Sequence, residues 1–354
     1  MTEPINVGVI GLGRMGMLHL VNSMKIDGVK VVAVADASKK ALKKAQLLGV
    51  KTGYQDYHEL LSKTPSIDSV IISLPNFLHF ESIKLALETG VNVFAEKPLA
   101  TSTEECREIV RLVDKSGRKL MVGHVSRFME MNQKLKQNLD KGIVGNLVVA
   151  TIEEIINGPF AHPRVPAPVA DWWFDPKKSG GGALLDVGYH MIDLFRFFAG
   201  ESKVMFSHLI HRYNLPVEDG AIVILQSRSS VKGIINIGWY QQTIFPKFNF
   251  RVLLHGTAGY LSSDSFVPRN LYSHAIKVGL KNIARRAVGK RIRFLAYTYY
   301  YECYYKELTH FFDCIKNDSE PSISAVDGLR TVETIEQAYK RSTMDQATNE
   351  AVAN

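Results

Sequence analysis

An aspartate and a histidine, Asp186 and His190, stand four positions apart in a segment of helical character that reads GGGALLDVGYHMID. On a helix this spacing places both side chains on one face. A neutral imidazole, with an unperturbed pKa of about 6.5, can take the proton of a hydroxyl group. Asp186 can orient that imidazole or hold a substrate hydroxyl, and a purely structural hydrogen bond between the two side chains is the alternative.

A lysine, Lys97, follows the apolar run Asn92–Ala95 within the sequence Glu96-Lys97-Pro98. An ammonium group stabilises the negative oxygen that develops when a carbinol is oxidised. A lysine at a strand end can instead be an ordinary solvated residue. Combined with a histidine base, Lys97 suits the removal of hydride from a carbon that carries a hydroxyl group. We therefore predict the catalytic residues to be Lys97, Asp186 and His190.

A glycine-rich turn offers a place for a hydride acceptor. Gly11, Gly13 and Gly16 follow the apolar run Ile5–Ile10 and precede a helical stretch, which is the context of the dinucleotide-binding fingerprint. The three glycines allow, in turn, a tight bend, the close approach of a pyrophosphate, and close packing of the helix on the strand. The N-terminus of the helix then offers free N–H groups to the phosphates.

An aspartate, Asp36, ends the second apolar run, Val29–Ala35, 20 residues beyond Gly16. A carboxylate at this place accepts the hydroxyls of the adenosine ribose and repels the 2′-phosphate of NADP, so NAD is the expected cofactor. Lys39 and Lys40 follow closely and soften that preference, which keeps NADP open.

Further cofactor contacts are expected after the neighbouring strands, because ligands of open α/β sheets bind outside the carboxyl ends of the strands. His79 begins a helix, where a structural role is as common as a cofactor contact. Arg127 lies near the expected domain junction, where it can form a salt bridge between domains; a contact with cofactor or substrate there is what resemblance to a known family implies. The predicted cofactor site comprises Gly11, Gly13, Arg14, Met15, Gly16, Asp36, Leu74, Pro75, Asn76, His79, Glu96, Lys97 and Arg127.

The elements that position these residues follow from the apolar pattern. Residues 1–123 alternate apolar runs with helical stretches, which indicates an α/β domain with a doubly wound parallel sheet, the Rossmann arrangement. Residues 124–354 contain an apolar helix, Ala183–Ala199, and then strand-like runs with few helices between them. We expect an α+β domain for substrate binding and oligomerisation, with an open, mainly antiparallel sheet. The final helix, at about 325–341, is expected to pack back on the first domain. The strand-like runs are Val204–Ile210, Ala221–Gln226, Gly233–Trp239, Phe248–Leu254 and Tyr260–Ser262.

From Ile5 to the final helix the chain resembles the Gfo/Idh/MocA family, which includes glucose–fructose oxidoreductase and inositol dehydrogenase. The resemblance rests on the order of the glycine turn, Pro75-Asn76, Glu96-Lys97-Pro98 and the segment with Asp186 and His190. It implies an NAD(P)-dependent enzyme that transfers hydride between nicotinamide and a CH–OH carbon of a sugar or sugar nucleotide. It also implies that the family's catalytic lysine, aspartate and histidine fall on Lys97, Asp186 and His190. Two alternatives stay open: a dehydrogenase of cyclitols such as inositol, and a non-catalytic NAD-binding regulator.

The composition is that of a globular protein with two cores, because 46% of the 354 residues are apolar and 22% are charged. No apolar run reaches the ~18 residues of a membrane span and no signal peptide is recognisable, so a cytoplasmic protein is expected. The three cysteines lack the spacing of metal ligands, and we expect no metal. The chain shows none of the usual nucleic-acid-binding motifs, so nucleic acid is not an expected partner.

Two runs of the second domain, Ile222–Leu225 and Ile234–Ile237, are apolar on both faces of a strand. A sheet with one solvated face would alternate apolar and polar residues, so the second face is expected to be covered. The strands of this domain also outnumber the helices available to cover them. Together with the resemblance, this predicts a homodimer or homotetramer built through the sheet.

The net charge of +8 is concentrated in one segment, because no acidic residue stands between Asp264 and Glu302. Ile276, Leu280 and Ile283 share one helical face within it, so the segment is amphipathic as well as basic. It suits a solvated or oligomer-facing helix, an anionic membrane surface, or the diphosphate of a sugar nucleotide. Its eight basic residues are Arg269, Lys277, Lys281, Arg285, Arg286, Lys290, Arg291 and Arg293.

Overall fold

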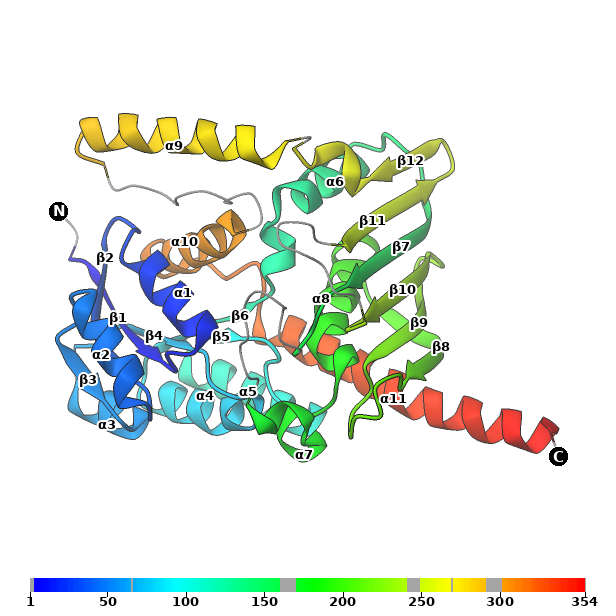
Figure 1. Ribbon diagram of the computed structural model, residues 1–354, viewed down its shortest axis with the longest axis horizontal. Helices are drawn as coiled ribbons and strands as arrows, with labels where there is room; N and C mark the ends of the chain where they lie inside the picture. Colours follow the sequence, from blue (N-terminus) through cyan, green and yellow to red (C-terminus); the bar gives the residue numbers. More distant parts are fainter. Residues whose placement is uncertain are drawn as a thin grey trace. The chain divides into compact units, whose positions relative to one another are not determined.

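The computed structural model describes residues 3–64, 66–159, 170–240, 249–268, 270–290 and 301–353. The chain divides into two compact units, each built from more than one stretch of sequence (Figure 1). The first unit comprises Met1–Ala100, Glu104–Phe128 and Pro268–Leu329, and the second comprises Thr101–Thr103, Met129–Val267 and Arg330–Asn354. The domain boundary expected after residue 123 stays a prediction.

The first unit contains a six-stranded parallel sheet in the order β3-β2-β1-β4-β5-β6. Its strands are fully or almost fully buried where they cross the centre, because α1 and α10 lie on one side of the sheet and α4 and α5 on the other (Figure 1). The predicted doubly wound parallel sheet is confirmed. The strands are β1 (Ile5–Ile10), β2 (Val29–Ala35), β3 (Thr52–Tyr54), β4 (Ser69–Ile72), β5 (Asn92–Glu96) and β6 (Leu120–Gly123).

The helices of this unit follow the strands in alternation, and three further helical segments come from the later part of the chain. The short edge strand β3 is not among the predicted elements. The helices are α1 (Arg14–Ser23), α2 (Lys39–Leu47), α3 (Tyr57–Lys63), η1 (Asn76–Leu78), α4 (His79–Glu88), α5 (Thr103–Ser116), η2 (Val125–Phe128), α9 (Leu271–Ala287), α10 (Glu302–Lys316) and the first turn of α11 (Ala325–Ala353).

The strand order reverses direction between β1 and β4, since β2 and β3 lie on one side of β1 and β4 to β6 lie on the other. At such a switch point the loops after two adjacent parallel strands run to opposite faces and leave a crevice between them. The glycine turn follows β1, and the loop with Pro75 and Asn76 follows β4. The topology therefore puts both predicted cofactor segments at the crevice.

The start of the final helix belongs to the first unit. The backbone N–H of Val122 donates to the carbonyl oxygen of Ile323, just before α11. A side chain at Gly328, in the first turn of α11, would contact Leu99 at 2.9 Å and Val122 at 3.1 Å. Close packing at Gly328 thus anchors the beginning of α11 against the end of β6.

The second unit contains a six-stranded sheet in the order β12-β11-β7-β10-β9-β8. Only the pair β7 and β10 is parallel, and all other neighbours are antiparallel. The predicted open, mainly antiparallel sheet is confirmed, but the central strand β7 is not among the predicted runs. The strands are β7 (Leu147–Ile155), β8 (Ser202–Ile210), β9 (Gly220–Ser227), β10 (Lys232–Gly238), β11 (Asn249–Gly256) and β12 (Gly259–Ser262).

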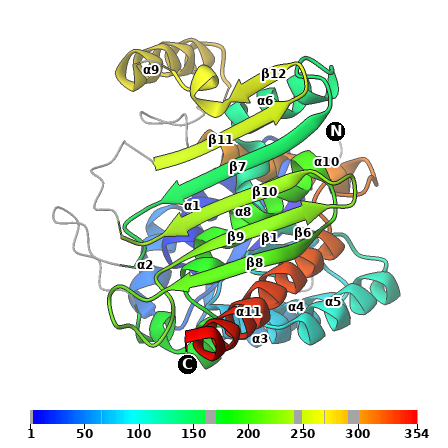
Figure 2. The same cartoon turned by 90° about the vertical axis from the view of Figure 1, so that its right-hand side faces the viewer.

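One face of this sheet packs on α8, which contacts β7, β9 and β10. Figure 2 shows the sheet from its opposite face. The remaining helical segments of the unit are short apart from α6 and the long C-terminal part of α11. The helices are α6 (Glu130–Asp140), η3 (Asp171–Phe174), α7 (Pro176–Ser179), α8 (Ala183–Ala199) and η4 (Ser263–Phe266). Within the described part of the chain, no helix has both the length and the apolar character needed to cross a membrane.

Candidate functional site

The glycine turn is packed so tightly that two of its residues have no room for a side chain. Gly11 has a φ of +84°, and a Cβ there would lie 2.5 Å from the carbonyl oxygen of Ser73, beyond the end of β4. A Cβ on Gly16 would lie 1.7 Å from the carbonyl oxygen of Gly11. Backbone therefore touches backbone at both places, which brings the N-terminus of α1 directly over the end of β1.

Gly13 has the opposite surroundings, since a Cβ there would meet nothing within 4 Å. It is also the N-cap residue of α1, and no side chain caps the helix at this position. Arg14 is exposed and Met15 half-buried in the first turn that follows. Open space beside uncapped N–H groups is what a pyrophosphate needs at a helix N-terminus, so the turn fits the phosphates of a dinucleotide.

Asp36 is held against this turn by two backbone hydrogen bonds. Its Oδ2 accepts from the N–H of Leu12 at 2.6 Å, and its Oδ1 accepts from the N–H of Ser38 at 2.7 Å. Each carboxylate oxygen keeps a further lone pair, so the group can still accept hydroxyl donors. The carboxylate is thus fixed at the end of β2, facing the glycine turn.

His79 ties together the two loops that carry Asn76 and Lys97. Its Nδ1 lies 2.6 Å from the carbonyl oxygen of Pro98, and its Nε2 lies 2.9 Å from the carbonyl oxygen of Leu74. The ring is completely buried, and burial lowers the pKa of His79 although both carbonyl oxygens oppose the shift. His79 therefore acts as an internal link between the ends of β4 and β5, while its predicted contact with the cofactor stays a prediction.

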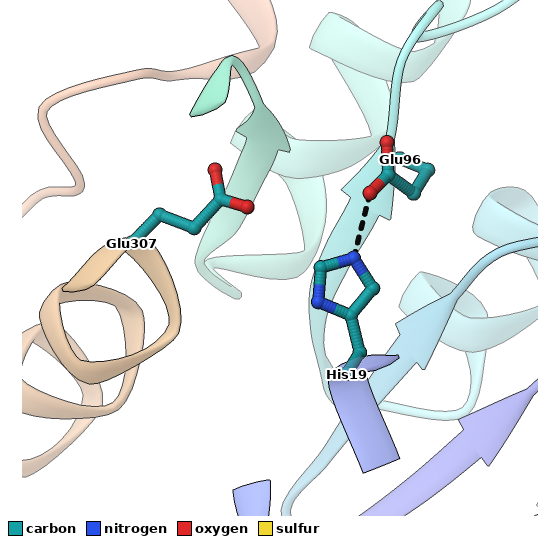
Figure 3. Close-up of side chains that lie close together, drawn as sticks. All are labelled: His19, Glu96 and Glu307. Atoms are coloured by element: carbon teal, nitrogen blue, oxygen red, sulfur yellow. Dashed lines mark hydrogen bonds and ion pairs between the residues drawn. The ribbon is translucent and has the colours of Figure 1, made fainter. Parts of the chain in front are cut away.

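Glu96, immediately before Lys97, is buried and uses both carboxylate oxygens inside the protein. Oε1 lies 2.6 Å from Nε2 of His19, on α1 (Figure 3). Oε2 accepts from the backbone N–H of Lys97 at 3.2 Å. Burial raises the pKa of the Glu96 carboxyl, but the hydrogen bond from His19 and the charge of Lys97 outweigh it, so the net shift is downward. The carboxylate is therefore ionised, and it fixes the backbone that carries Lys97.

A second carboxyl group, that of Glu307 on α10, points toward the same imidazole (Figure 3). Glu307 is 0% exposed, and neither its carboxyl oxygens nor Nδ1 of His19 has a hydrogen-bond partner among the described residues. Burial, reinforced by the charge of Glu96, raises the pKa of Glu307 well above its usual value. The pKa values of the two neighbouring carboxyl groups are thus shifted in opposite directions, that of Glu96 downward and that of Glu307 upward.

His19, Glu96 and Glu307 place atoms that are able to bind a metal within 4.8 Å of one another. The 2.6 Å between His19 and Glu96 is a hydrogen-bond distance. It is shorter than the separation of about 3 Å between two ligands of one cation with bonds near 2.1 Å. The arrangement as it stands therefore holds a proton between His19 and Glu96.

Arg127, in η2, pairs with an acidic residue of the same unit. Its Nη2 lies 3.1 Å from Oδ1 of Asp327, in the first turn of α11, and the arginine is only 9% exposed. Asp327 also accepts from the N–H and the hydroxyl of Ser324. Arg127 thus helps to hold α11 on the first unit, and its predicted contact with cofactor stays a prediction.

In the second unit, Asp186 and His190 stand one turn apart on α8, as the spacing predicts. Oδ2 of Asp186 accepts from Nε1 of the fully buried Trp239 at 3.2 Å. The indole of Trp239 in turn packs against Trp173, with ring centroids 6.3 Å apart. A buried aromatic group therefore fixes the orientation of the Asp186 carboxylate.

The triple glycine before α8 makes room for a buried carboxyl group and a tyrosine. A Cβ on Gly181 would lie 2.1 Å from the hydroxyl oxygen of Tyr339, and one on Gly182 would lie 2.0 Å from the carbonyl oxygen of Glu218. Oε1 of Glu218 accepts from the N–H groups of Gly182 and Leu184 and from the Tyr339 hydroxyl, at 2.8–3.0 Å. Glu218 thus caps the helix that carries Asp186 and His190.

Sequence reasoning missed five of these residues: His19, Glu218, Trp239, Glu307 and Tyr339. Each lies far along the chain from its partner, for example 36 residues for Glu218 and Gly182 and 77 for His19 and Glu96. The only local signal was the triple glycine, because three consecutive glycines before an apolar helix indicate a close approach of other groups.

Comparison with known family models covers the greater part of the chain. Residues 5–124 match the oxidoreductase family with an NAD-binding Rossmann fold, Gfo/Idh/MocA, and residues 132–262 match the C-terminal domain of that family. The chain belongs to the Gfo/Idh/MocA family. It is therefore an oxidoreductase with an NAD-binding domain, and the family predicted from the motifs is confirmed.

Individual relatives match nearly the full length of this chain, and nearly their own full length is matched in turn. The chain is 26% identical to myo-inositol 2-dehydrogenase of Thermotoga maritima, over 92% of this chain and 92% of that protein. It is 26% identical to 1,5-anhydro-D-fructose reductase of Ensifer adhaerens, over 96% of this chain and 97% of that protein. The crystal structure of GenD2 from gentamicin A biosynthesis, a complex with NAD, superimposes with a TM-score of 0.81 at 19% identity and covers 97% of this chain and 95% of that one.

The raised pKa of Glu307 predicts how stability depends on pH. The folded protein keeps the Glu307 proton to a higher pH than the unfolded chain, which releases it above about pH 4.3. The contribution of Glu307 to the free energy of unfolding therefore decreases as pH rises. We expect Glu307→Gln, which is neutral at every pH, to gain up to about 1.4 kcal/mol over the wild type for each pH unit between about pH 5 and pH 7. Urea unfolding across that range measures the difference. The exposed Glu88→Gln is the matched control, and parallel profiles for Glu307→Gln and the wild type would contradict the prediction.

Proposed function

We propose that the chain is an NAD(P)-dependent dehydrogenase of sugars or sugar nucleotides, which moves a hydride between the nicotinamide and a carbinol carbon. The observation that carries the proposal is Lys97, an ammonium-bearing residue at the carboxyl end of β5 whose backbone is fixed by the buried Glu96. It belongs to the same unit as the glycine turn and Asp36, which fit a dinucleotide. Both full-length relatives are named for reactions on cyclic polyhydroxylated molecules.

The residues of the glycine turn, Asp36 and the loop after β4 keep their predicted roles in this proposal. The N–H groups at Gly13, Arg14 and Met15 hold the pyrophosphate, and Asp36 holds the adenosine ribose. Gly11 and Gly16 bring the helix close enough for this contact. The loop after β4, with Leu74, Pro75 and Asn76, lines the crevice at the switch point of the sheet.

Each catalytic residue has one task. Bound NAD would supply the hydride acceptor for the substrate carbon. The Lys97 ammonium stabilises the negative charge that develops on the substrate oxygen. His190 takes the hydroxyl proton as the C–O bond becomes a carbonyl, and Asp186, oriented by Trp239, holds a neighbouring substrate hydroxyl. In the reducing direction His190 would return the proton to the substrate oxygen, and the reduced cofactor would supply the hydride.

Cyclitols are the second candidate substrates, because the relative from Thermotoga maritima is named for myo-inositol. A non-catalytic NAD-binding regulator is disfavoured, since such a protein has no need for Lys97, Asp186 and His190 together. A panel of polyols, free sugars and UDP-sugars, assayed by NADH absorbance, distinguishes these functions. Turnover of a cyclitol alone would replace the sugar proposal, and no turnover with any of them at saturating NAD would favour the regulator.

Replacement of Lys97 tests the mechanism. We expect Lys97→Met to lower turnover by about 10²–10³-fold, because one charge-stabilising group is lost, while NAD affinity stays unchanged. Steady-state kinetics and calorimetry measure the two effects. Lys115→Met removes an exposed lysine of α5 and serves as the control. Normal turnover of Lys97→Met would remove this residue from the mechanism.

The position of Asp36 predicts the choice of cofactor. We expect NAD to bind about tenfold or more tightly than NADP, because ~1.4 kcal/mol of repulsion between the carboxylate and the 2′-phosphate is sufficient for that ratio. Isothermal calorimetry of both cofactors measures it, and Asp36→Ser should reduce the difference. Tighter binding of NADP to the wild type would refute the argument.

We also propose a homodimer or homotetramer that buries the open face of the second unit's sheet. On this face Ile224 is paired with Phe206 of β8 and with Ile234 of β10. Phe206 and Ile234 are 39% and 40% exposed, and Ile222 on the next row of β9 is 38% exposed. A contiguous apolar row across three strands is rarely left in water and supports a contact with a second copy.

The introduction of two lysines into this row tests the proposal. We expect Ile224→Lys with Ile234→Lys to convert the oligomer into a 39.6 kDa monomer, since lysines placed opposite lysines repel across a symmetric interface. Sedimentation at micromolar concentration measures the mass. Ile143→Lys, at an exposed position outside the sheet, is the control. A monomeric wild type, or a double variant with the wild-type mass, would overturn the proposal.

A further inference from the structure

Helix α9 turns its large apolar residues toward solvent. Tyr272, Ile276, Leu280 and Ile283 recur at intervals of four, four and three residues, which forms one stripe along the helix. These four side chains are 62–68% exposed. A surface helix of a globular protein normally buries such a stripe against the core. The outward stripe therefore requires another explanation.

The side of α9 that is buried carries small residues and one polar side chain. Asn282 is only 4% exposed, and Ala275, Val278 and Gly279 are half-buried. At 100° per residue Val278 and Asn282 lie on the side of the helix opposite Ile276. Ala275 and Gly279 lie nearer the margin of the stripe. The helix thus shows an inverted arrangement, with its bulky aliphatic residues outward.

Cationic residues border the stripe on both sides. Lys277 and Lys281 follow Ile276 and Leu280 along one flank, and Arg286 lies on the other flank; all three are exposed. No acidic residue occurs between Asp264 and Glu302 to neutralise them. Arg269, Arg291 and Arg293 of the basic segment lie outside the described residues. The exposed face of α9 is therefore apolar along its centre and positive along its edges.

This pattern favours a lipid surface over the other anionic partners. Aliphatic side chains enter the boundary between headgroups and acyl chains, while the flanking cations meet the lipid phosphates. A nucleic acid or a soluble diphosphate would bind the cations but leave the aliphatic stripe in water. A second α9 packed on the first would bring cationic flanks together with no acid to offset them.

We propose that α9 is an interfacial helix that binds this protein to anionic membrane surfaces and lies in the plane of the membrane. The proposal concerns where the enzyme acts and is independent of the substrate assigned above. Turnover of a soluble substrate without vesicles reports on the dehydrogenase separately, so failure of one proposal leaves the other measurable.

Flotation with lipid vesicles tests the proposal on the full-length chain. We expect the wild type to float with vesicles of phosphatidylcholine and phosphatidylglycerol at about 0.1 M salt, and to be released in large part at about 0.5 M salt. Vesicles of phosphatidylcholine alone should retain about tenfold less protein, because each basic residue near an anionic surface contributes binding.

Two double variants separate the two parts of the surface. Ile276→Gln with Ile283→Gln removes two aliphatic residues of the stripe. Lys277→Glu with Lys281→Glu reverses the charge along one flank of the stripe. Gln and Glu are good helix formers, so α9 should persist. We expect each double variant to lose about tenfold or more in vesicle binding with unchanged turnover of a soluble substrate. The matched control is Lys43→Glu with Lys44→Glu, the same change of charge on exposed residues of α2, which should bind like the wild type.

Several results would overturn the proposal. One is the absence of wild-type binding to anionic vesicles, and another is equal binding to neutral and anionic vesicles. Double variants that float like the wild type would also remove α9 from the contact. Loss of self-association in the stripe variant, without any vesicle binding by the wild type, would assign the face to a second copy. Retention of duplex DNA but not of vesicles would assign it to nucleic acid.

Discussion

The contact between Gly16 and the carbonyl oxygen of Gly11 sets the position of α1, on which the candidate residues of the first unit depend. Any side chain at Gly16 would lie 1.7 Å from that oxygen, so α1 reaches its place only with glycine there. Its placement has two consequences. The uncapped N-terminus of α1 faces open space at Gly13, and His19, further along the same helix, reaches Glu96 at the end of β5. The close approach therefore supports both the proposed phosphate site and the backbone of Lys97.

Buried carboxyl groups fix the segments on which the chemistry depends. His19 and Lys97 lower the pKa of Glu96, whereas burial without a hydrogen-bond partner among the described residues raises the pKa of Glu307. Glu218 performs the corresponding task in the second unit, where it caps α8 and so orients the helix that carries the predicted base. Such groups are costly to bury. Glu96 holds the backbone of Lys97, and Glu218 holds the start of the helix that carries Asp186 and His190.

Two exposed apolar surfaces differ in charge, and the difference determines the partner that each one suits. The open face of the second unit's sheet is apolar across β8, β9 and β10, which suits contact with an identical face. The outer face of α9 has an apolar centre with cationic edges, which opposes self-association and suits an anionic surface. The same physical property, exposed aliphatic area, thus points to two different kinds of interaction.

The sequence by itself determined the features that depend on neighbouring residues. The glycine turn, the strands β1 and β2, the spacing of Asp186 and His190, and the amphipathic pattern of the basic segment are all local, because dihedral freedom and apolar periodicity act over a few residues. Only the tertiary structure decided which distant side chains support them. Trp239 on Asp186, His19 on Glu96, and Tyr339 and Glu218 beside the triple glycine come from segments 36 to 158 positions away. Strand β7, with polar residues at Glu153 and Glu154, was equally hidden, because its central place in the sheet depends on pairing with β10 and β11. Likewise, periodicity defined the stripe on α9, but only packing of the folded chain decided that the stripe faces outward, since either side of a helix can in principle be turned to the core.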